Sequence, residues 1–283
     1  MEVGLFFTAG EGAVDIARVA RAAETAGFGS LWVGEHVLMP VEYEHVYPGS
    51  ADGVPPSFAR LLSSPLIALA RAAAVTESLR IGTGVCLLPL REPIALAKDI
   101  ATLDNDSGGR FLFGVGGGWM REETEILGGD FDRRWRQIAD SVSAMKALWR
   151  DDVSRHEGPY TRFPPVEMRP KPCQSPYPPV LLGGASPHIF DRIAAWGDGW
   201  IPGVSSVAEV REGREQLFAS VRRVGRDPED FTLVAFGLPD ALRTRSEAEA
   251  LQELGVHHMT VWLQARGEAV FAEIDALAHC MLA

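Results

Sequence analysis

The sequence of 283 residues contains only three cysteines, Cys86, Cys173 and Cys280, which are far apart in the chain. Disulfide frameworks need more cysteines, and zinc sites place them in close pairs. The sequence therefore predicts neither a disulfide framework nor a zinc site. We expect a protein of a reducing compartment with no metal ion.

Positive charge is also scarce, because 27 Lys and Arg residues are set against 38 Asp and Glu residues, which gives a net charge of −11 at pH 7. Without a local basic patch, such a chain repels the phosphates of nucleic acids and the head groups of anionic membranes. We therefore expect no nucleic-acid partner and no membrane partner.

Long apolar runs are missing as well. The longest uncharged stretch, residues 172–190, contains five prolines, and the N-terminus carries Glu2 where a signal peptide has basic residues. The sequence predicts neither a signal peptide nor a membrane span, so we expect a cytoplasmic protein.

Several catalytic and nucleotide-binding motifs are missing too, among them the P-loop, His-Glu-x-x-His and Gly-x-Ser-x-Gly. The run GVGGGW at residues 114–119 is the nearest match to the dinucleotide fingerprint of a doubly wound open sheet. Trp119 stands where that fingerprint needs a third glycine or an alanine, and the run follows the fourth predicted strand rather than the first. Both features argue against the doubly wound sheet.

The chain does contain a regular alternation of short apolar runs and amphipathic stretches, in a composition with 46% hydrophobic residues that is typical of globular proteins. Eight strand–helix units in about 250 residues are what a closed parallel barrel requires. We therefore predict an α/β fold, a (β/α)8 TIM barrel, as a single domain over residues 1–283. Long loops are expected at 40–64, after strand two, and at 151–178, before strand five. The predicted strands are 2–7, 30–34, 80–84, 110–115, 179–183, 199–202, 231–236 and 257–263.

Active sites of such barrels lie at the carboxyl ends of the strands, so the residues after each strand are the first candidates. Gly183, Gly184 and Ala185 follow strand five, and Ser186 and Pro187 fit an N-cap and a first helical position. A helix N-terminus behind flexible glycines is typical of a phosphate site. An ordinary strand-to-helix turn explains the same residues.

Two other strand ends carry candidate residues. After strand four, Gly117, Gly118 and Trp119 favour a bulky ligand lying on bare backbone, although a tight turn accounts for the glycines nearly as well. After strand two, His36 is placed to act as a general base or to donate a hydrogen bond to a ligand, or it is a structural histidine. Glu35 points to the other side of the extended chain.

Sequence strings along most of the chain resemble the luciferase-like monooxygenase superfamily. They lie at residues 26–36, 81–85, 88–93, 107–110, 114–119 and 198–200, in family order. Within the superfamily, these motifs are similar to those of the branch that uses the deazaflavin coenzyme F420 rather than FMN.

The resemblance implies a flavin-like ring at the carboxyl face of the barrel. A non-prolyl cis peptide behind the central ring would fall at Gly84–Val85, and His36 would line the ring pocket. The backbone of Gly117, Gly118 and Trp119 would follow the ring edge. The coenzyme phosphate would contact Gly183, Gly184 and Ala185.

One residue departs from the sugar-phosphate dehydrogenase branch of this family, which has a glutamate where Trp119 stands and a tryptophan near Pro40. The departure indicates a different substrate and a different proton-transfer scheme.

The resemblance thus implies an F420-dependent oxidoreductase that transfers a hydride between the deazaflavin C5 and an unidentified small organic substrate. His36 would orient the ring or the substrate, or supply a proton. Two alternatives remain: a two-component monooxygenase that uses FMN, and a non-catalytic F420-binding protein. Homodimers are usual in this family.

Overall fold

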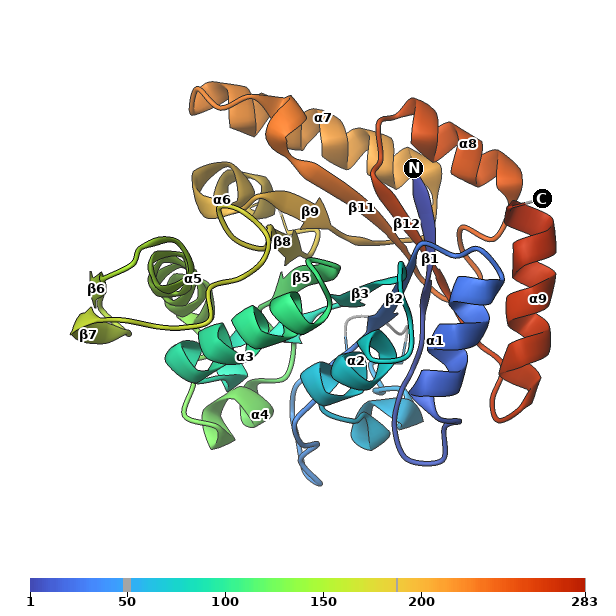
Figure 1. Ribbon diagram of the computed structural model, residues 1–283, viewed down its shortest axis with the longest axis horizontal. Helices are drawn as coiled ribbons and strands as arrows, with labels where there is room; N and C mark the ends of the chain where they lie inside the picture. Colours follow the sequence, from blue (N-terminus) through green and yellow to red (C-terminus); the bar gives the residue numbers. More distant parts are fainter. Residues whose placement is uncertain (48–51, 187, 283) are drawn as a thin grey trace.

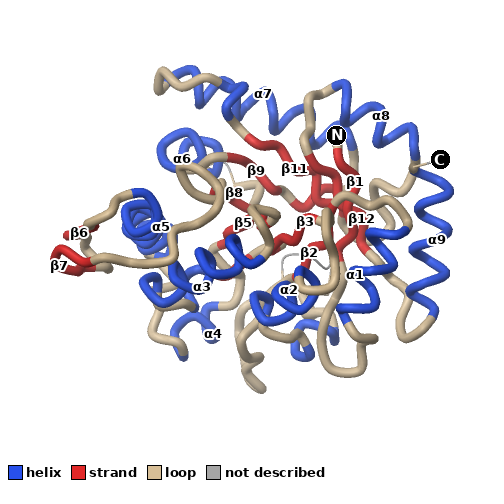
Figure 2. Tube along the Cα trace, in the orientation of Figure 1, coloured by secondary structure: helices blue, strands red, loops and turns tan. Residues whose placement is uncertain are grey.

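Parallel strands close into a barrel at the centre of the protein, and helices surround it (Figures 1 and 2). The computed structural model describes residues 1–47, 52–186 and 188–282. Each barrel strand pairs in parallel with the next, and β12 pairs with β1 to close the ring. The barrel strands are β1 (Glu2–Phe6), β2 (Ser30–Val33), β3 (Arg80–Thr83), β5 (Phe111–Gly116), β8 (Val180–Gly183), β9 (Gly199–Ile201), β11 (Thr232–Gly237) and β12 (His258–Trp262).

These strands confirm the predicted (β/α)8 barrel, since every predicted strand overlaps an observed one. Two further strands extend the ladders at the carboxyl face: β4 (Cys86–Leu87) pairs with β5, and β10 (Gly203–Val204) pairs with β11. The helices are α1 (Ile16–Thr25), α2 (Pro65–Ala73), α3 (Pro93–Asp106), α4 (Arg121–Ile126), α5 (Arg134–Arg150), α6 (Ile189–Trp196), α7 (Val207–Arg223), α8 (Arg245–Glu253) and α9 (Ala269–Met281), with 3₁₀ turns at Ser57–Leu61, Leu88–Leu90 and Pro228–Asp230.

The core has two layers, because each barrel strand buries one face against helices and the other inside the barrel. On α9, the apolar residues Val270, Ile274, Leu277 and Met281 are buried in the core cluster outside the barrel. Inside the barrel, Trp32 is fully buried, and a Cβ atom at Gly82 would lie 2.4 Å from its ring. The other interior residues are Phe6, Leu112, Leu181, Ile201, Val234 and Phe236.

The predicted long loop at 151–178 is partly wrong, because it contains the antiparallel hairpin of β6 (Ser154–Glu157) and β7 (Arg162–Val166). Pro164 and Pro165 favoured a loop, but in a two-stranded ribbon a residue without an N–H group can face the open edge. The last part of the segment reaches the amino end of the barrel. Gln174 donates to the carboxylate of Asp104 and to the carbonyl of Phe111, at the amino end of β5.

Candidate active site

A pocket of about 340 Å³ opens at the carboxyl ends of the barrel strands. Its volume is within the range of about 300–1,000 Å³ that is typical of small-molecule sites. Among the residues predicted to hold a cofactor, all except His36 and Ala185 line this pocket. The lining consists of Gly84, Val85, Leu87, Gly116, Gly117, Gly118, Trp119, Trp135, Gly183, Gly184, Ile201, Gly203, Phe236 and Leu238.

The floor of the pocket is a bulge between β3 and β4. Gly82 pairs with Leu112 and Cys86 pairs with Val115, so one chain advances four residues while its neighbour advances three. The extra residue makes a β-bulge. The Gly84–Val85 peptide bond in this bulge is cis, as the resemblance implied.

The side chain of Val85 explains two of the glycines around the floor. A Cβ atom at Gly116 would lie 2.4 Å from Cγ2 of Val85, and one at Gly183 would lie 3.0 Å from its Cγ1. Phe236 packs equally closely on Gly84, where a Cβ atom would lie 2.5 Å from the ring. Small residues at these positions therefore allow Val85 and Phe236 to form the floor.

His36 is held by a buried carboxylate on α4, the helix that follows β5. Its Nδ1 lies 2.7 Å from Oε2 of Glu123, whose side chain is only 2% exposed. Oε1 of Glu123 accepts hydrogen bonds from the backbone N–H groups of Val37 and Leu38. With the Nδ1 proton directed at Glu123, Nε2 of His36 is free to accept the hydrogen bond donated by Nε1 of Trp119 at 3.3 Å.

Trp119 connects this histidine to the pocket. Its ring lines the pocket and meets the imidazole of His36 edge-on, with ring centroids 5.7 Å apart. Tyr47 packs on Trp119 from the loop after β2, at 5.2 Å, and burial raises the pKa of its phenol. The loop thus contributes an aromatic cover to the rim of the site.

Glu122 fastens the same loop to α4. Its Oε1 accepts hydrogen bonds from the backbone N–H groups of Glu44 and His45 and lies 3.4 Å from Nδ1 of His45. Burial raises the pKa of Glu122, but the hydrogen bonds together outweigh burial and lower it to about 2. The His45 ring packs on Phe131 at 5.3 Å, so the loop is held at two points.

Two arginines flank Trp135 at the edge of the pocket near Gly117. The guanidinium of Arg192 lies over the Trp135 ring at 4.6 Å, and a Cβ atom at Gly117 would be 3.3 Å from Nε of Arg134. Within residues 1–47, 52–186 and 188–282, the buried Nε of Arg134 has no hydrogen-bond partner. Burial lowers the pKa of both arginines, and Arg134 further lowers that of Arg192. Such a pair is suited to bind an anionic group.

The predicted start of the helix after β8 is wrong. The helix begins at Ile189 with His188 at the cap position, and the Ser186 side chain does not cap it. Instead, the carbonyl of Ser186 accepts from the N–H of Ile189, which makes a preceding turn. Pro187, predicted at the first helical position, lies outside the described residues. Gly184, with φ of +118°, has the conformation that favours glycine.

The remaining residues considered from the sequence, Ala185 and Glu35, do not line this pocket. Ala185 lines a neighbouring pocket of about 350 Å³ together with the acidic residues Glu209 and Glu212. Glu35 faces away from His36, as expected, since its buried carboxylate binds the N–H of Leu87 and the guanidinium of Arg91. In the described part of the chain, no group of three or more His, Cys, Asp or Glu residues is arranged to hold a metal ion.

Sequence reasoning missed Glu123, Arg134 and Arg192. The acidic pair Glu122-Glu123 comes three residues after Trp119, and this closeness to the glycine–tryptophan run is the only local signal for Glu123. Neither arginine belongs to a motif, so only the packing of the helices around the barrel brings Arg192 to Trp135 and Arg134 to Gly117.

The family model described as luciferase-like monooxygenase matches residues 1–279. The chain belongs to this family. An uncharacterised protein of Mycobacterium tuberculosis is 35% identical to this luciferase-like protein over 252 residues, 87% of this chain and 88% of that one. The FMNH2-dependent dimethylsulfone monooxygenase of Pseudomonas putida is 28% identical over 211 residues, 74% of this chain and 53% of its own length.

Solved structures agree with the fold of this luciferase-like protein. The coenzyme F420-dependent tetrahydromethanopterin reductase of Methanopyrus kandleri superposes with a TM-score of 0.75 at 14% identity, over 99% of this chain and 98% of that chain. The barrel is therefore that of luciferase-like oxidoreductases and monooxygenases. No helix in the described ranges is both long and apolar enough to cross a membrane.

Proposed function

We propose that this protein is an oxidoreductase that binds coenzyme F420 at the carboxyl face of the barrel and transfers a hydride between the deazaflavin C5 and a small organic substrate. The observation that carries the proposal is the apolar pocket of about 340 Å³ with its bulged floor at Gly84–Val85 and two arginines at its edge.

The residues of the pocket fit such a group. Its lining is mostly apolar, as a planar ring system requires, and bare backbone at Gly117, Gly118 and Gly184 leaves room for close approach. Arg134 and Arg192 place two positive charges where the anionic part of the coenzyme would lie. We assign the ring to Gly84, Val85 and Trp119, and the phosphate to Gly183, Gly184 and Ala185 with these arginines.

When bound, a deazaflavin supplies a carbon that donates or accepts a hydride. The task of the chain is then to orient the reactants and to control protons. Glu123 holds the proton on Nδ1 of His36, and the lone pair of Nε2 accepts the hydrogen bond from Trp119. His36 can therefore take up a proton at Nε2 once Trp119 gives up this hydrogen bond. The ionised Glu123 stabilises the imidazolium form of His36 once Nε2 is protonated.

The rim of the pocket excludes water. Trp119 and Tyr47 cover one side of the mouth, and Glu122 keeps the loop that carries Tyr47 attached to α4. Excluding water strengthens the electrostatic interactions within the site and protects the hydride from side reactions.

A second candidate function is FMN-dependent monooxygenation, as in the dimethylsulfone enzyme named above. It is favoured by Glu209 and Glu212, which line the pocket next to Ala185 and would repel the oligoglutamate tail of F420. FMN has no such tail, and its phosphate alone would occupy Gly183, Gly184 and the two arginines.

An anaerobic titration followed by absorbance distinguishes the two. The proposal predicts that F420 binds with micromolar or better affinity and at least tenfold more tightly than FMN. Tighter binding of FMN, together with oxygen consumption by the protein with reduced FMN, would replace the first candidate by the second. Binding of neither cofactor would refute both.

A further inference from the structure

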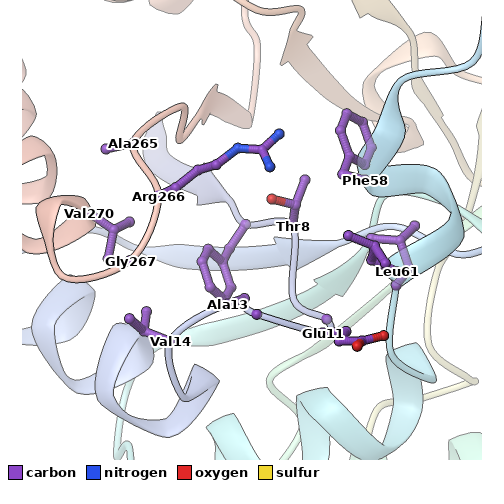
Figure 3. A pocket seen from close by; sticks show the side chains of 14 residues that line it. Thr8, Glu11, Ala13, Val14, Phe58, Leu61, Ala265, Arg266, Gly267 and Val270 are labelled. Carbon is purple, nitrogen blue, oxygen red and sulfur yellow. The ribbon is translucent and has the colours of Figure 1, made fainter.

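A second pocket, of about 70 Å³, lies on another side of the barrel mouth (Figure 3). It is bounded by the loop after β1, the 3₁₀ turn Ser57–Leu61 and the loop between β12 and α9. The volume holds several water-sized groups. It is sufficient for the end of a small molecule and too small for a tricyclic ring.

A chain of aromatic contacts connects this pocket to the cofactor pocket. Phe58, which lines the second pocket, packs edge-on against Trp262 with ring centroids 5.6 Å apart. Trp262 contacts Phe6 at 4.5 Å, and Phe6 contacts Phe236 at 4.9 Å. Because Phe236 lines the cofactor pocket, an apolar wall runs from one pocket to the other.

The charged side chains that line the second pocket are Arg266 and Glu11. Figure 3 shows the guanidinium of Arg266 extending toward Thr8 and Phe58, while the carboxylate of Glu11 points toward the Leu61 side. In the part of the chain that the structure describes, Arg266 forms no ion pair or hydrogen bond. Arg266 is exposed, so its guanidinium is accessible to a ligand that enters from solvent.

We propose that the substrate is an organic carboxylate with a planar apolar body. The carboxylate binds Arg266 and the hydroxyl of Thr8, and the apolar body lies on Phe58 and Trp262, extending toward the cofactor. This inference rests on the proposed function, because it places the reacting end of the substrate beside the cofactor pocket. An unpaired guanidinium beside an aromatic surface supplies both the bidentate charge contact and the apolar contact that such a molecule needs.

The test compares three probes that share a benzene ring: benzoate, benzyl alcohol and benzylamine. Their dissociation constants are measured by ligand-observed NMR on the wild-type protein, without added cofactor and with the cofactor it binds. We expect benzoate to bind roughly fivefold to tenfold more tightly than benzyl alcohol, as for a charge-assisted contact in a partly exposed site. Equal affinities, or a preference for benzylamine through Glu11, would overturn the proposal.

Variants of single arginines show which residue causes the preference for benzoate. Arg266→Gln should abolish the preference for benzoate, and Arg266→Lys should retain part of it. Arg223→Gln, which changes an exposed arginine at the end of α7, should leave it unchanged. A preference for benzoate that survives Arg266→Gln would contradict the assignment of the site.

The proposed function and the proposed substrate class can be disproved separately. Cofactor affinity is measured on the same proteins and should be equal in wild type and Arg266→Gln. Loss of cofactor binding in all proteins would contradict the proposed function, and the comparison of probes without cofactor would still decide the substrate class.

Discussion

The Nδ1 atom of His36 and the Oε2 atom of Glu123 lie 2.7 Å apart, although 87 residues separate them in the chain. The carboxylate comes from the first turn of α4 and is almost completely buried. Its other oxygen binds the two backbone N–H groups that follow His36. This arrangement fixes the side chain of His36 and the start of the loop after β2 together.

Replacement of Glu123 by glutamine should therefore impair turnover more than binding. A glutamine keeps the size of the side chain but cannot stabilise a protonated imidazole by its charge. We expect turnover to fall by roughly 10- to 100-fold, in the range for an orienting partner, with cofactor affinity changed less than threefold. The measurement is steady-state kinetics with the cofactor and substrate that the protein uses.

The matched control is Glu125→Gln, which changes an exposed carboxylate on the same helix. It should leave turnover unaltered. Equal losses of turnover in the two variants, or no loss in Glu123→Gln, would show that the His36–Glu123 contact is only structural.

Attachment of the loop should depend on pH through Glu122. Its pKa in the folded protein, about 2, is below the ordinary value of 4.5, so the ionised carboxylate stabilises the folded state above pH 4.5. That stabilisation is lost as the pH falls from 4.5 toward 2. Wild type should accordingly unfold at a higher temperature than Glu122→Gln at pH 7, and the difference should shrink below pH 4.5. A difference that stays constant with pH would contradict this assignment.

The floor of the pocket should be sensitive to a single methyl group. Gly116→Ala places a Cβ atom 2.4 Å from Val85, so the variant should lose about 1–3 kcal/mol of unfolding free energy and most of its cofactor affinity. Val85→Ala removes the clashing atoms, so the double variant should regain part of the stability. Denaturant unfolding and cofactor titration measure both quantities. Additive losses in the double variant would rule out this steric contact.

The two arginines near Gly117 should make cofactor binding sensitive to salt. Arg134→Gln and Arg192→Gln should each weaken cofactor binding by roughly tenfold, as expected for a contact between a charged group and a phosphate. Wild-type affinity should fall as the salt concentration rises. Arg133→Gln, at an exposed neighbouring position, is the control and should bind like wild type. Salt-independent affinity would indicate that the anionic part of the cofactor lies elsewhere.

The barrel could be predicted from the sequence because each strand is a short apolar run bounded by turn residues. Such a pattern can be recognised within a few consecutive residues. Gly117, Gly118 and Gly184 could be placed for the same reason, since they come directly after a strand. The bulge at Gly84–Val85 was instead implied by the family resemblance. The start of α6 could not be predicted from Ser186 alone, because a further turn precedes the helix. Glu123, Arg134 and Arg192 depend on packing between distant segments, which no local pattern records.

The most direct measurement is a crystal structure of the protein grown anaerobically with saturating F420, with a second crystal grown with FMN. The account predicts density for a planar ring system on the bulge at Gly84–Val85, between Phe236 and Trp119, with the phosphate near Gly183, Gly184 and Arg192. A ring bound at any other part of the protein, or a pocket filled only by water in both crystals, would contradict it.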